Sequence, residues 1–362
     1  MQTVDNQQSP DGEIGRRARF RIWWSNPCGF ESLSGHFLVK IGIVGSYGHE
    51  CVKLLPGAEL AWACEGSDQT AVARAAAFGC TKTFSSMEGL LADFRPDLVY
   101  IGTFYAGNGP LAIRALELGF DVVSEKPLAA DWETLDRLSA LTASGQRRVI
   151  AEFAMRWSAS FQKARELILG GRIGRVVMIQ AQKTYQFGTA RPDFYKSRKL
   201  FGGIIPWVAV HAIDYAAWCT GLRYESVTAT HGNTCFPGYP EMEDHAALLF
   251  QMTGGVPCVI TADFLRPGGA SSHGDDRLRV TGSEGVLEVR NDEVFLADSR
   301  KEHHWICPTN DPAAIQRAED LAGAALGNSA TAITTAECLH ITAAALAARD
   351  AADTGCRQML KY

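Results

Sequence analysis

The chain has 362 residues, of which 46% are hydrophobic and 21% are charged, and its formal net charge at pH 7 is −5. This length suits about two domains, and the composition is typical of a globular protein that buries a core. The negative charge argues against a nucleic-acid or membrane-surface partner, because both require basic patches. No stretch reaches the ~18 consecutive apolar residues of a membrane span. The ten cysteines are scattered, without C-x-x-C pairs or metal-type spacing, which favours reduced thiols and a cytoplasmic location.

Residues 1–38 differ from the rest of the chain, because they are polar and contain recurrent Pro, Gly and Ser. Arg16-Arg17 is the kind of pair found in twin-arginine export signals, but no apolar core of about 7–15 residues follows it. We expect residues 1–38 to be a disordered extension, or the product of an upstream start codon, rather than a targeting peptide.

Residues 39–154 show alternating strand and helix patterns. Apolar, strand-like runs lie at 39–44, 58–66, 95–103, 120–127 and 147–155. Helical patterns lie at 51–55, 67–79, 109–119 and 131–145, with Gly79 and Gly119 as C-terminal stops. Strands that alternate with helices pair in parallel through right-handed crossovers. We therefore predict the α/β fold class, with an N-terminal Rossmann domain that contains a doubly wound parallel sheet.

Residues 155–362 show a different order of helix and strand patterns. Helical patterns lie at 161–170, 203–220 and 330–352, and period-two strand patterns lie at 175–185, 226–233, 244–253, 256–265, 276–291 and 293–298. Period-two strands with few helices between them predict a C-terminal α+β domain with a large, mainly antiparallel sheet. We expect this domain to bind substrate and to mediate oligomerisation, with a cleft between it and the Rossmann domain.

The turn after the first strand is a partial dinucleotide-binding fingerprint. The pattern G-x-G-x-x-G needs glycine at 45, 47 and 50, whereas the chain has Gly45, Tyr47 and Glu50, with an extra Gly48. Gly45, Ser46, Tyr47 and Gly48 are the candidate cofactor contacts, but Glu50 in the first helical turn would repel phosphate. By itself the loop is as consistent with an empty turn as with a bound cofactor.

Glu65 follows the second strand, twenty residues after Gly45. A carboxylate at this place accepts hydrogen bonds from the adenosine ribose hydroxyls of a dinucleotide. Because no Arg or Lys lies at 65–73 to bind a 2′-phosphate, the sequence favours NAD(H) over NADP(H). A solvated acid at a strand end is the alternative.

The segment "SEKPL" (124–128) ends a parallel strand at its carboxyl edge, where open α/β sheets bind ligands. Pro127 ends the strand, and we expect it to direct Lys126, next to Glu125, into the cleft. Partial desolvation there would lower the pKa of Lys126 toward the range useful for proton transfer. A surface lysine beside a strand-end glutamate is the alternative.

The helix at 203–220 carries a polar pair on an apolar background. Four of its residues, at i, i+4, i+7 and i+11, are predicted to share one face: Trp207, His211, Asp214 and Trp218. A histidine and an aspartate on such a helix are costly unless they are used or paired. A catalytic His211 and a core histidine bonded to Asp214 both stay open.

Candidate substrate contacts lie in the loop at 184–199, which carries Tyr185, Arg191, Tyr195 and Lys196. Arg191 and Lys196 indicate a substrate with a carboxylate or phosphate, although a solvated charged loop is the alternative. We expect no metal site, because the spacing of the candidate ligands predicts no helix pair and no alternate residues on one strand. Those candidate ligands are His211, His245, His273 and Asp275.

Taken together, several of these segments resemble the Gfo/Idh/MocA family, the group that includes glucose–fructose oxidoreductase and inositol dehydrogenase. The resemblance rests on the βαβ opening, "DLVYIGT", "AIRALELGFDVVSEKPLA", the G-G…H-x-x-D helix and "RLRVTGSEGVLEV". It implies reversible NAD(P)-dependent oxidation of a hydroxyl on a sugar, polyol or related small molecule. It also implies that Lys126 lies near the reacting carbon and the nicotinamide ribose, and that His211 exchanges a proton with the substrate hydroxyl.

The chain departs from the family pattern at two further places. Many members have an aspartate four residues before the histidine, where this chain has Trp207. Many have T-P after the fourth strand and a histidine four residues beyond the proline, where this chain has Thr103-Phe104 and Asn108. We retain Thr103 and Asn108 as candidate cofactor contacts, and Trp207 as a substrate contact that could stack on a sugar ring or an aromatic substrate.

The sequence therefore predicts an NAD(H)-dependent oxidoreductase, active as a homodimer or homotetramer on a small-molecule substrate. In this hypothesis Lys126 and His211 handle the proton, and Asp214 orients the imidazole of His211. Two alternatives stay open: a non-catalytic sensor of the same fold that binds a nucleotide or sugar, and an NAD-using lyase or glycosidase without net oxidation. The altered phosphate loop and Trp207 favour the sensor, whereas Lys126 and His211 oppose it.

Overall fold

The computed structural model describes residues 39–47, 52–55, 57–64, 69–80, 82–308, 312–327 and 333–360. The predicted extension at 1–38, the phosphate-loop residues Gly48 and Glu50, and Glu65 lie outside the described residues. The remaining predicted elements and site residues can be compared with the structure.

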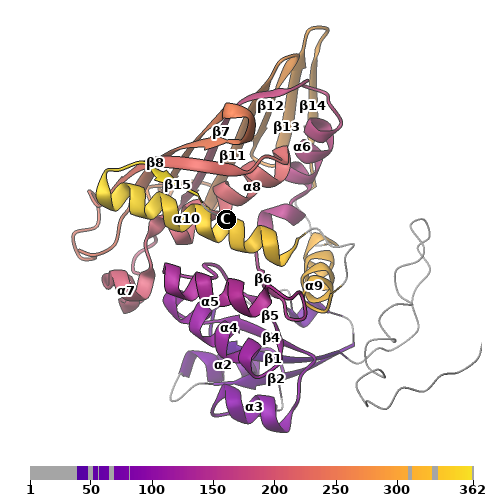
Figure 1. The fold of residues 1–362 in the computed structure, drawn as a ribbon, viewed down its shortest axis with the longest axis vertical. Coiled ribbons are helices and arrows are strands. Elements are labelled where there is room, and N and C mark those ends of the chain that lie inside the picture. The colour runs from indigo at the N-terminus through magenta and orange to yellow at the C-terminus, as the bar shows by residue number, and fades with distance from the viewer. Residues whose placement is uncertain are drawn as a thin grey trace, which may run out of the picture. The chain divides into compact units, whose positions relative to one another are not determined.

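The first half of the described chain forms a six-stranded parallel sheet in the order β3-β2-β1-β4-β5-β6 (Figure 1, indigo to purple). The direction of strand progression reverses at β1, which pairs with β2 on one side and with β4 on the other. This is the doubly wound parallel sheet that the alternation of strands and helices predicts, and the prediction is confirmed. The strands are β1 (Val39–Gly45), β2 (Ala58–Ala63), β3 (Lys82–Phe84), β4 (Leu98–Gly102), β5 (Asp121–Ser124) and β6 (Val149–Ala151).

The helices that connect these strands begin at side-chain caps where the sequence supplies them. Asp131 caps α5 by accepting a hydrogen bond from the backbone N–H of Thr134 at 2.7 Å, and Ser86 caps α3. The short strand β3 and helix α3 are absent from the sequence-based prediction. The helices are α2 (Gln69–Ala77), α3 (Met87–Asp93), α4 (Asn108–Glu117) and α5 (Trp132–Thr142), with short 3₁₀ turns at Val52–Leu54 and Tyr105–Gly107.

The second half of the chain builds a nine-stranded sheet in the order β14-β13-β12-β11-β7-β10-β9-β8-β15. Among the described strand pairs of this nine-stranded sheet only β7–β10 is parallel, so the predicted, mainly antiparallel sheet is confirmed. The predicted run at 276–291 is two strands, β11 and β12. The strands are β7 (Val176–Tyr185), β8 (Tyr224–Gly232), β9 (His245–Met252), β10 (Val256–Asp263), β11 (Gly274–Gly282), β12 (Gly285–Arg290), β13 (Glu293–Asp298), β14 (Glu302–Ile306) and β15 (Gln358–Met359).

Helices from the second half of the chain contact both sheets. The long helix α10, yellow in Figure 1, begins at a capping box formed by Thr334 and Glu337 and ends at Gly355. Its Asp350 accepts a hydrogen bond from the indole of Trp132 on α5 at 2.6 Å, which joins α10 to the parallel-sheet region. The helices are α6 (Ala159–Leu169), α7 (Arg198–Phe201), α8 (Val210–Thr220), α9 (Pro312–Ala325) and α10 (Thr335–Thr354), with 3₁₀ turns at Ala154–Trp157, Asp193–Lys196 and Thr253–Gly255.

The predicted helix at 203–220 is interrupted. Gly202 and Gly203 both have positive φ, and a wide π-helical turn at Ile205–Ala209 precedes α8, which ends at Gly221. A π turn changes the angular spacing of side chains, so Trp207 leaves the regular i, i+4 register with α8. By length and hydropathy, the run from Arg198 to Thr220 could cross a membrane, but 83% of its apolar window is buried inside the protein. This burial is typical of a core helix.

Gly45 at the end of β1 provides a test of the parallel sheet. Its φ is +98°, and a Cβ atom there would lie 2.1 Å from the carbonyl oxygen of Gly102 on β4. We expect Gly45→Ala to lower the free energy of unfolding by more than about 3 kcal/mol, because backbone strain adds to the steric clash. Gly79→Ala is the matched control, since Gly79 has φ +73° but no atom within 4 Å of a Cβ. The control should lose only about 1–2 kcal/mol; equal losses in urea unfolding would contradict this account.

Candidate active site

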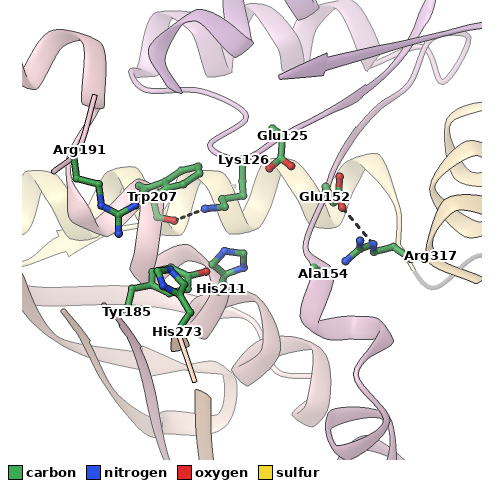
Figure 2. A pocket seen from close by; sticks show the side chains of 10 residues that line it. All are labelled: Glu125, Lys126, Glu152, Ala154, Tyr185, Arg191, Trp207, His211, His273 and Arg317. Atoms are coloured by element: carbon green, nitrogen blue, oxygen red, sulfur yellow. Dashed lines mark hydrogen bonds and ion pairs between the residues drawn. The ribbon is translucent and has the colours of Figure 1, made fainter. Parts of the chain in front are cut away.

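A pocket with a volume of about 340 Å³ lies where residues of the two sheet regions converge (Figure 2). It brings together Lys126 and His211, the two residues that sequence analysis assigns to proton transfer. It also contains four of the other predicted contacts, Glu125, Tyr185, Arg191 and Trp207. The full lining is Glu125, Lys126, Glu152, Ala154, Tyr185, Arg191, Trp207, His211, His273 and Arg317.

The carboxyl ends of two neighbouring parallel strands supply one side of the pocket. Glu125 and Lys126 directly follow β5, and Glu152 directly follows β6. The backbone N–H of Glu125 donates to Ile101 O at 2.7 Å, and that of Glu152 donates to Ser124 O at 2.9 Å. These bonds extend the sheet pairing past the strand ends and fix the backbone from which the side chains project.

The ammonium group of Lys126 is buried, with the whole residue only 5% exposed. It donates a hydrogen bond to the carbonyl oxygen of Trp207 at 3.0 Å, and its Nζ lies 2.8 Å from the centre of the Trp207 ring. Burial lowers the pKa of Lys126 well below its usual range. The positive charges of Lys183 and Arg191 lower this pKa further, whereas the negative charges of Glu125 and Glu152 oppose the shift. Lys126 therefore gives up a proton more readily than a surface lysine does.

Trp207 belongs to an aromatic cluster beside the pocket. Its ring stacks on Tyr105 with centroids 3.4 Å apart, and the Tyr105 hydroxyl is hydrogen-bonded to the Tyr195 hydroxyl at 2.5 Å. Tyr47 contacts Tyr105 edge-on at 6.3 Å. Tyr195 is 1% exposed and does not line the pocket, so the structure does not support its predicted contact with substrate. Its hydroxyl instead positions Tyr105, which sequence analysis did not single out.

His211 is the best-placed proton acceptor in the pocket. It is 6% exposed, and neither ring nitrogen has a hydrogen-bond partner among the described residues. Burial lowers its pKa well below the usual range, and the positive charges of Lys126 and Lys183 lower it further. The imidazole is therefore neutral at pH 7, with an unused lone pair. Leaving a buried polar group unpaired costs about 1–3 kcal/mol. Such a group in a pocket is therefore a candidate for binding a ligand.

Asp214 does not orient His211, and this prediction is wrong. Its carboxylate accepts hydrogen bonds from the guanidinium of Arg156, with Nη2 to Oδ1 at 2.6 Å, and both side chains are 1% exposed. Arg156 also pairs with Glu337 at the start of α10 at 3.2 Å. His211 and Asp214 are three residues apart on α8 but have separate surroundings, because only His211 lines the pocket.

Of the predicted cofactor contacts that the structure describes, all but Asn108 lie at or directly after the ends of β1, β4 and β5, and Asn108 begins α4. Asn108 is fully buried, and its side chain accepts from Thr103 N at 2.9 Å and donates to Glu125 O at 3.2 Å. It therefore ties two strand ends together and presents no group to a cofactor, which corrects the prediction. The backbone N–H of Tyr47 donates to Gly102 O at 2.9 Å, and Ser46, which is 4% exposed, follows Gly45 directly.

Two charged residues of the pocket were missed by sequence analysis. Glu152 pairs with Arg317 at 3.3 Å and accepts a hydrogen bond from the Tyr100 hydroxyl. Glu152 could have been found, because it follows a parallel strand just as Glu125 does. Arg317 carried no such signal, since its helix α9 was not predicted. Within the described part of the chain, no group of three or more His, Cys, Asp or Glu residues could hold a metal ion.

Comparison with known proteins defines the family. A model of the oxidoreductase family with an NAD-binding Rossmann fold matches residues 39–153, and the GFO/IDH/MocA C-terminal domain matches residues 161–288. A solved structure from Thermotoga maritima, provisionally named an oxidoreductase, superposes with a TM-score of 0.82 at 32% identity, over 89% of this chain and 100% of that one. The chain belongs to the Gfo/Idh/MocA family of oxidoreductases.

Relatives within the Gfo/Idh/MocA family are distant. Inositol 2-dehydrogenase of Rhizobium meliloti is 26% identical over 70% of this chain and 74% of its own length. The chain spans a smaller part of two other relatives. Inositol 2-dehydrogenase 2 of Saccharopolyspora erythraea is 25% identical over 60% of this chain and 64% of its own length. The Bacillus subtilis oxidoreductase YteT is 27% identical over 37% of this chain and 32% of its own length. Levoglucosan dehydrogenase in complex with NADH superposes with a TM-score of 0.78 at 17% identity, over 90% of this chain and 99% of that one, and so shares the fold.

The Arg156–Asp214 pair gives a test of what holds α8 in place. We expect Asp214→Asn to lower the free energy of unfolding by about 3–5 kcal/mol, because it removes the buried counter-ion of Arg156 and leaves Glu337, whose side chain is 42% exposed, to balance the charge. Glu166→Gln is the control, since the Lys163–Glu166 pair (2.9 Å) is exposed and its loss should cost under about 1 kcal/mol. Urea unfolding measures both. If Asp214→Asn instead slows turnover at unchanged stability, Asp214 acts on His211 after all.

Proposed function

We propose that this protein is an NAD(H)-dependent oxidoreductase that transfers hydride between nicotinamide and a hydroxyl or carbonyl carbon of a sugar, polyol or related small molecule. The observation that carries the proposal is the neutral, unpartnered imidazole of His211 in one pocket with the buried ammonium of Lys126. Membership of an NAD-binding oxidoreductase family supports it, as does the similarity to inositol 2-dehydrogenases.

The ends of the central strands fit a dinucleotide. The order of strands reverses at β1 and β4, the position at which doubly wound sheets bind dinucleotides. Gly45, Ser46, Tyr47 and Thr103 lie at the ends of these two strands and would hold the cofactor, with Lys126 at the end of β5. When bound, nicotinamide supplies the acceptor or donor of the hydride.

The chain's own residues would manage the proton. In the oxidation direction a ring nitrogen of His211 accepts the proton of the substrate hydroxyl, and in reduction it returns that proton. Lys126 donates a hydrogen bond to the same oxygen and stabilises the negative charge that develops there. The indole and carbonyl of Trp207 take up one side of the ammonium, and the remaining N–H donors of the ammonium would contact the substrate.

The preference for NAD(H) over NADP(H) is also a proposal. It rests on Glu65 and on the lack of Arg or Lys at 65–73. Arg74 follows this window directly, and its Nη1 donates to the backbone carbonyl of Ser46 at 3.0 Å. This contact commits one donor of Arg74 to the protein.

Two substitutions test the assignment of His211 and Lys126. We expect His211→Ala and Lys126→Ala each to lower turnover by about 10²–10⁴-fold, because each removes a group that handles the proton or the oxyanion. The measurement is NADH absorbance with a panel of polyols and sugars. His304→Ala is the control, because His304 lies on the edge strand β14 and pairs with Glu293 at 3.1 Å; it should leave the rate unchanged.

The same samples separate the competing functions. NADH fluorescence should increase on binding to the wild type and to His211→Ala, with weaker binding of NADPH. Binding without any absorbance change over the panel would favour the sensor or the lyase, and product analysis by mass spectrometry distinguishes these two. Failure to bind either dinucleotide would contradict the proposal, and a variant with a near-normal rate would contradict its residue.

The low pKa of His211 predicts the pH dependence. A histidine with a depressed pKa stays neutral as the pH falls through 6.5, so the base required for oxidation is still present at pH 6. We therefore expect that protonation of His211 does not lower kcat/KM for oxidation between pH 7 and pH 6. Titration of the His211 ring by NMR, assigned with His211→Gln, measures the pKa directly; a value of 6.5 or higher would contradict the burial argument.

A further inference from the structure

The guanidinium of Arg191 is held at one side of the pocket by contacts that leave its charge uncompensated. Its Nη2 donates to the carbonyl oxygen of Gln186 at 2.7 Å, and its backbone exchanges hydrogen bonds with the Tyr239 hydroxyl at 2.8 and 3.0 Å. The carbon at the centre of the guanidinium lies 5.3–5.6 Å from three ring centres, those of Phe187, Tyr195 and Phe264. The aromatic rings and the loop backbone therefore position Arg191 without a salt bridge to any residue that the structure describes.

Two other arginines near the pocket have carboxylate partners, whereas Arg191, which is half-buried, has none among the described residues. Arg156 pairs with Asp214, and Arg317 pairs with Glu152. Arg191 forms no ion pair with any carboxylate of the described residues, and its Nε is buried without a hydrogen-bond partner. A partly desolvated cation without a counter-ion is less stable than a fully hydrated one, so an anion that enters the pocket would gain more here than at a surface arginine.

The surroundings of Arg191 are positive. Figure 2 shows Arg191 on the opposite side of the pocket from Glu152 and Arg317, with Lys126 between them. His273 also lines the pocket and stacks on Tyr185 with centroids 5.0 Å apart. Burial lowers the pKa of His273, and the charges of Arg191 and Lys183 lower it further, which reflects a positive potential at this side.

We propose that the substrate is a hydroxy acid, such as a sugar acid, whose carboxylate binds Arg191 while its reacting hydroxyl meets His211 and Lys126. The proposal rests on the proposed oxidoreductase function and adds the chemical class of the substrate. A single uncompensated guanidinium matches the single charge of a carboxylate. A phosphate dianion would bring a second negative charge into a pocket that already contains Glu125 and Glu152. Arg191 is the residue that selects an acid over a neutral sugar.

A matched series of ligands tests this directly. D-Glucose, D-glucuronamide, D-glucuronate and D-glucose 6-phosphate share one ring and differ at C6, and sorbitol with D-gluconate gives an open-chain pair. Calorimetric titration into the NADH-loaded protein measures binding without turnover. We expect at least one of the two acids, glucuronate or gluconate, to bind tenfold or more tightly than its neutral counterpart, and more tightly than glucose 6-phosphate.

Substitution of Arg191 should remove this preference. Arg191→Gln retains length and hydrogen bonding but not charge, so it should bring the acid and its neutral counterpart to within about twofold. Arg191→Lys should restore part of the difference, because it returns the charge without the planar fork. Lys199→Gln is the control, since Lys199 also carries a positive charge near Arg191 in sequence but is exposed and does not line the pocket; it should keep the preference.

The outcomes separate this proposal from the function on which it rests. Equal binding of acids and their neutral counterparts by the wild type, or an unchanged preference in Arg191→Gln with normal NADH binding and melting temperature, would overturn the carboxylate site. Tighter binding of glucose 6-phosphate than of both acids would overturn it in favour of a phosphate. Oxidation of neutral polyols would persist in either case if the oxidoreductase function is right, whereas loss of NADH binding by the wild type would contradict that function itself.

Discussion

The contact between the ammonium of Lys126 and the carbonyl and indole of Trp207 joins the two halves of the site. Lys126 extends from the end of a parallel strand, and Trp207 lies in the π turn that leads into α8, so this contact brings a strand end of the Rossmann sheet against the helix that carries His211. An ammonium that is 5% exposed is stable only where an oxygen or an aromatic face replaces water, and Trp207 supplies both. The position of His211 relative to Lys126 follows from this contact.

Helix α8 assigns opposite environments to its two polar side chains. Asp214 is paired with Arg156 in the core and anchors the helix, since a buried charge that loses its partner is strongly destabilising. His211 faces the pocket with both ring nitrogens unpartnered among the described residues, which burial alone would disfavour. The Arg156–Asp214 pair anchors the helix in the core, and the same helix presents the imidazole of His211 to the pocket that Lys126 lines.

The fold could be predicted from the sequence because burial imposes local patterns. Strands alternate with helices in the first half of the chain, and apolar residues alternate with polar residues in the strands of the second half. The same patterns placed Lys126 at a strand end and His211 on an apolar helix, and the family resemblance selected the catalytic role from the alternatives that these patterns leave open. Sequence reasoning failed for Asp214, since its partner Arg156 lies 58 positions away in sequence and no periodicity connects them. The π turn was missed for a related reason: regular spacing from Trp207 to Trp218 assumes one helical period. Asn108 was predicted as a cofactor contact because it stands where many family members have a histidine, and sequence patterns do not reveal its burial or its backbone partners.

The charges in the pocket connect substrate binding to proton transfer. Burial is the main cause of the low pKa of Lys126, and the positive charge of Arg191 contributes to it. A carboxylate bound to Arg191 would cancel that contribution, so the bound anion would raise the pKa of Lys126 and favour its charged form. A charged Lys126 is the better hydrogen-bond donor to an oxygen that gains negative charge. An acidic substrate would thereby strengthen the group that stabilises its own reacting hydroxyl, whereas a neutral sugar would leave Lys126 in the less effective state.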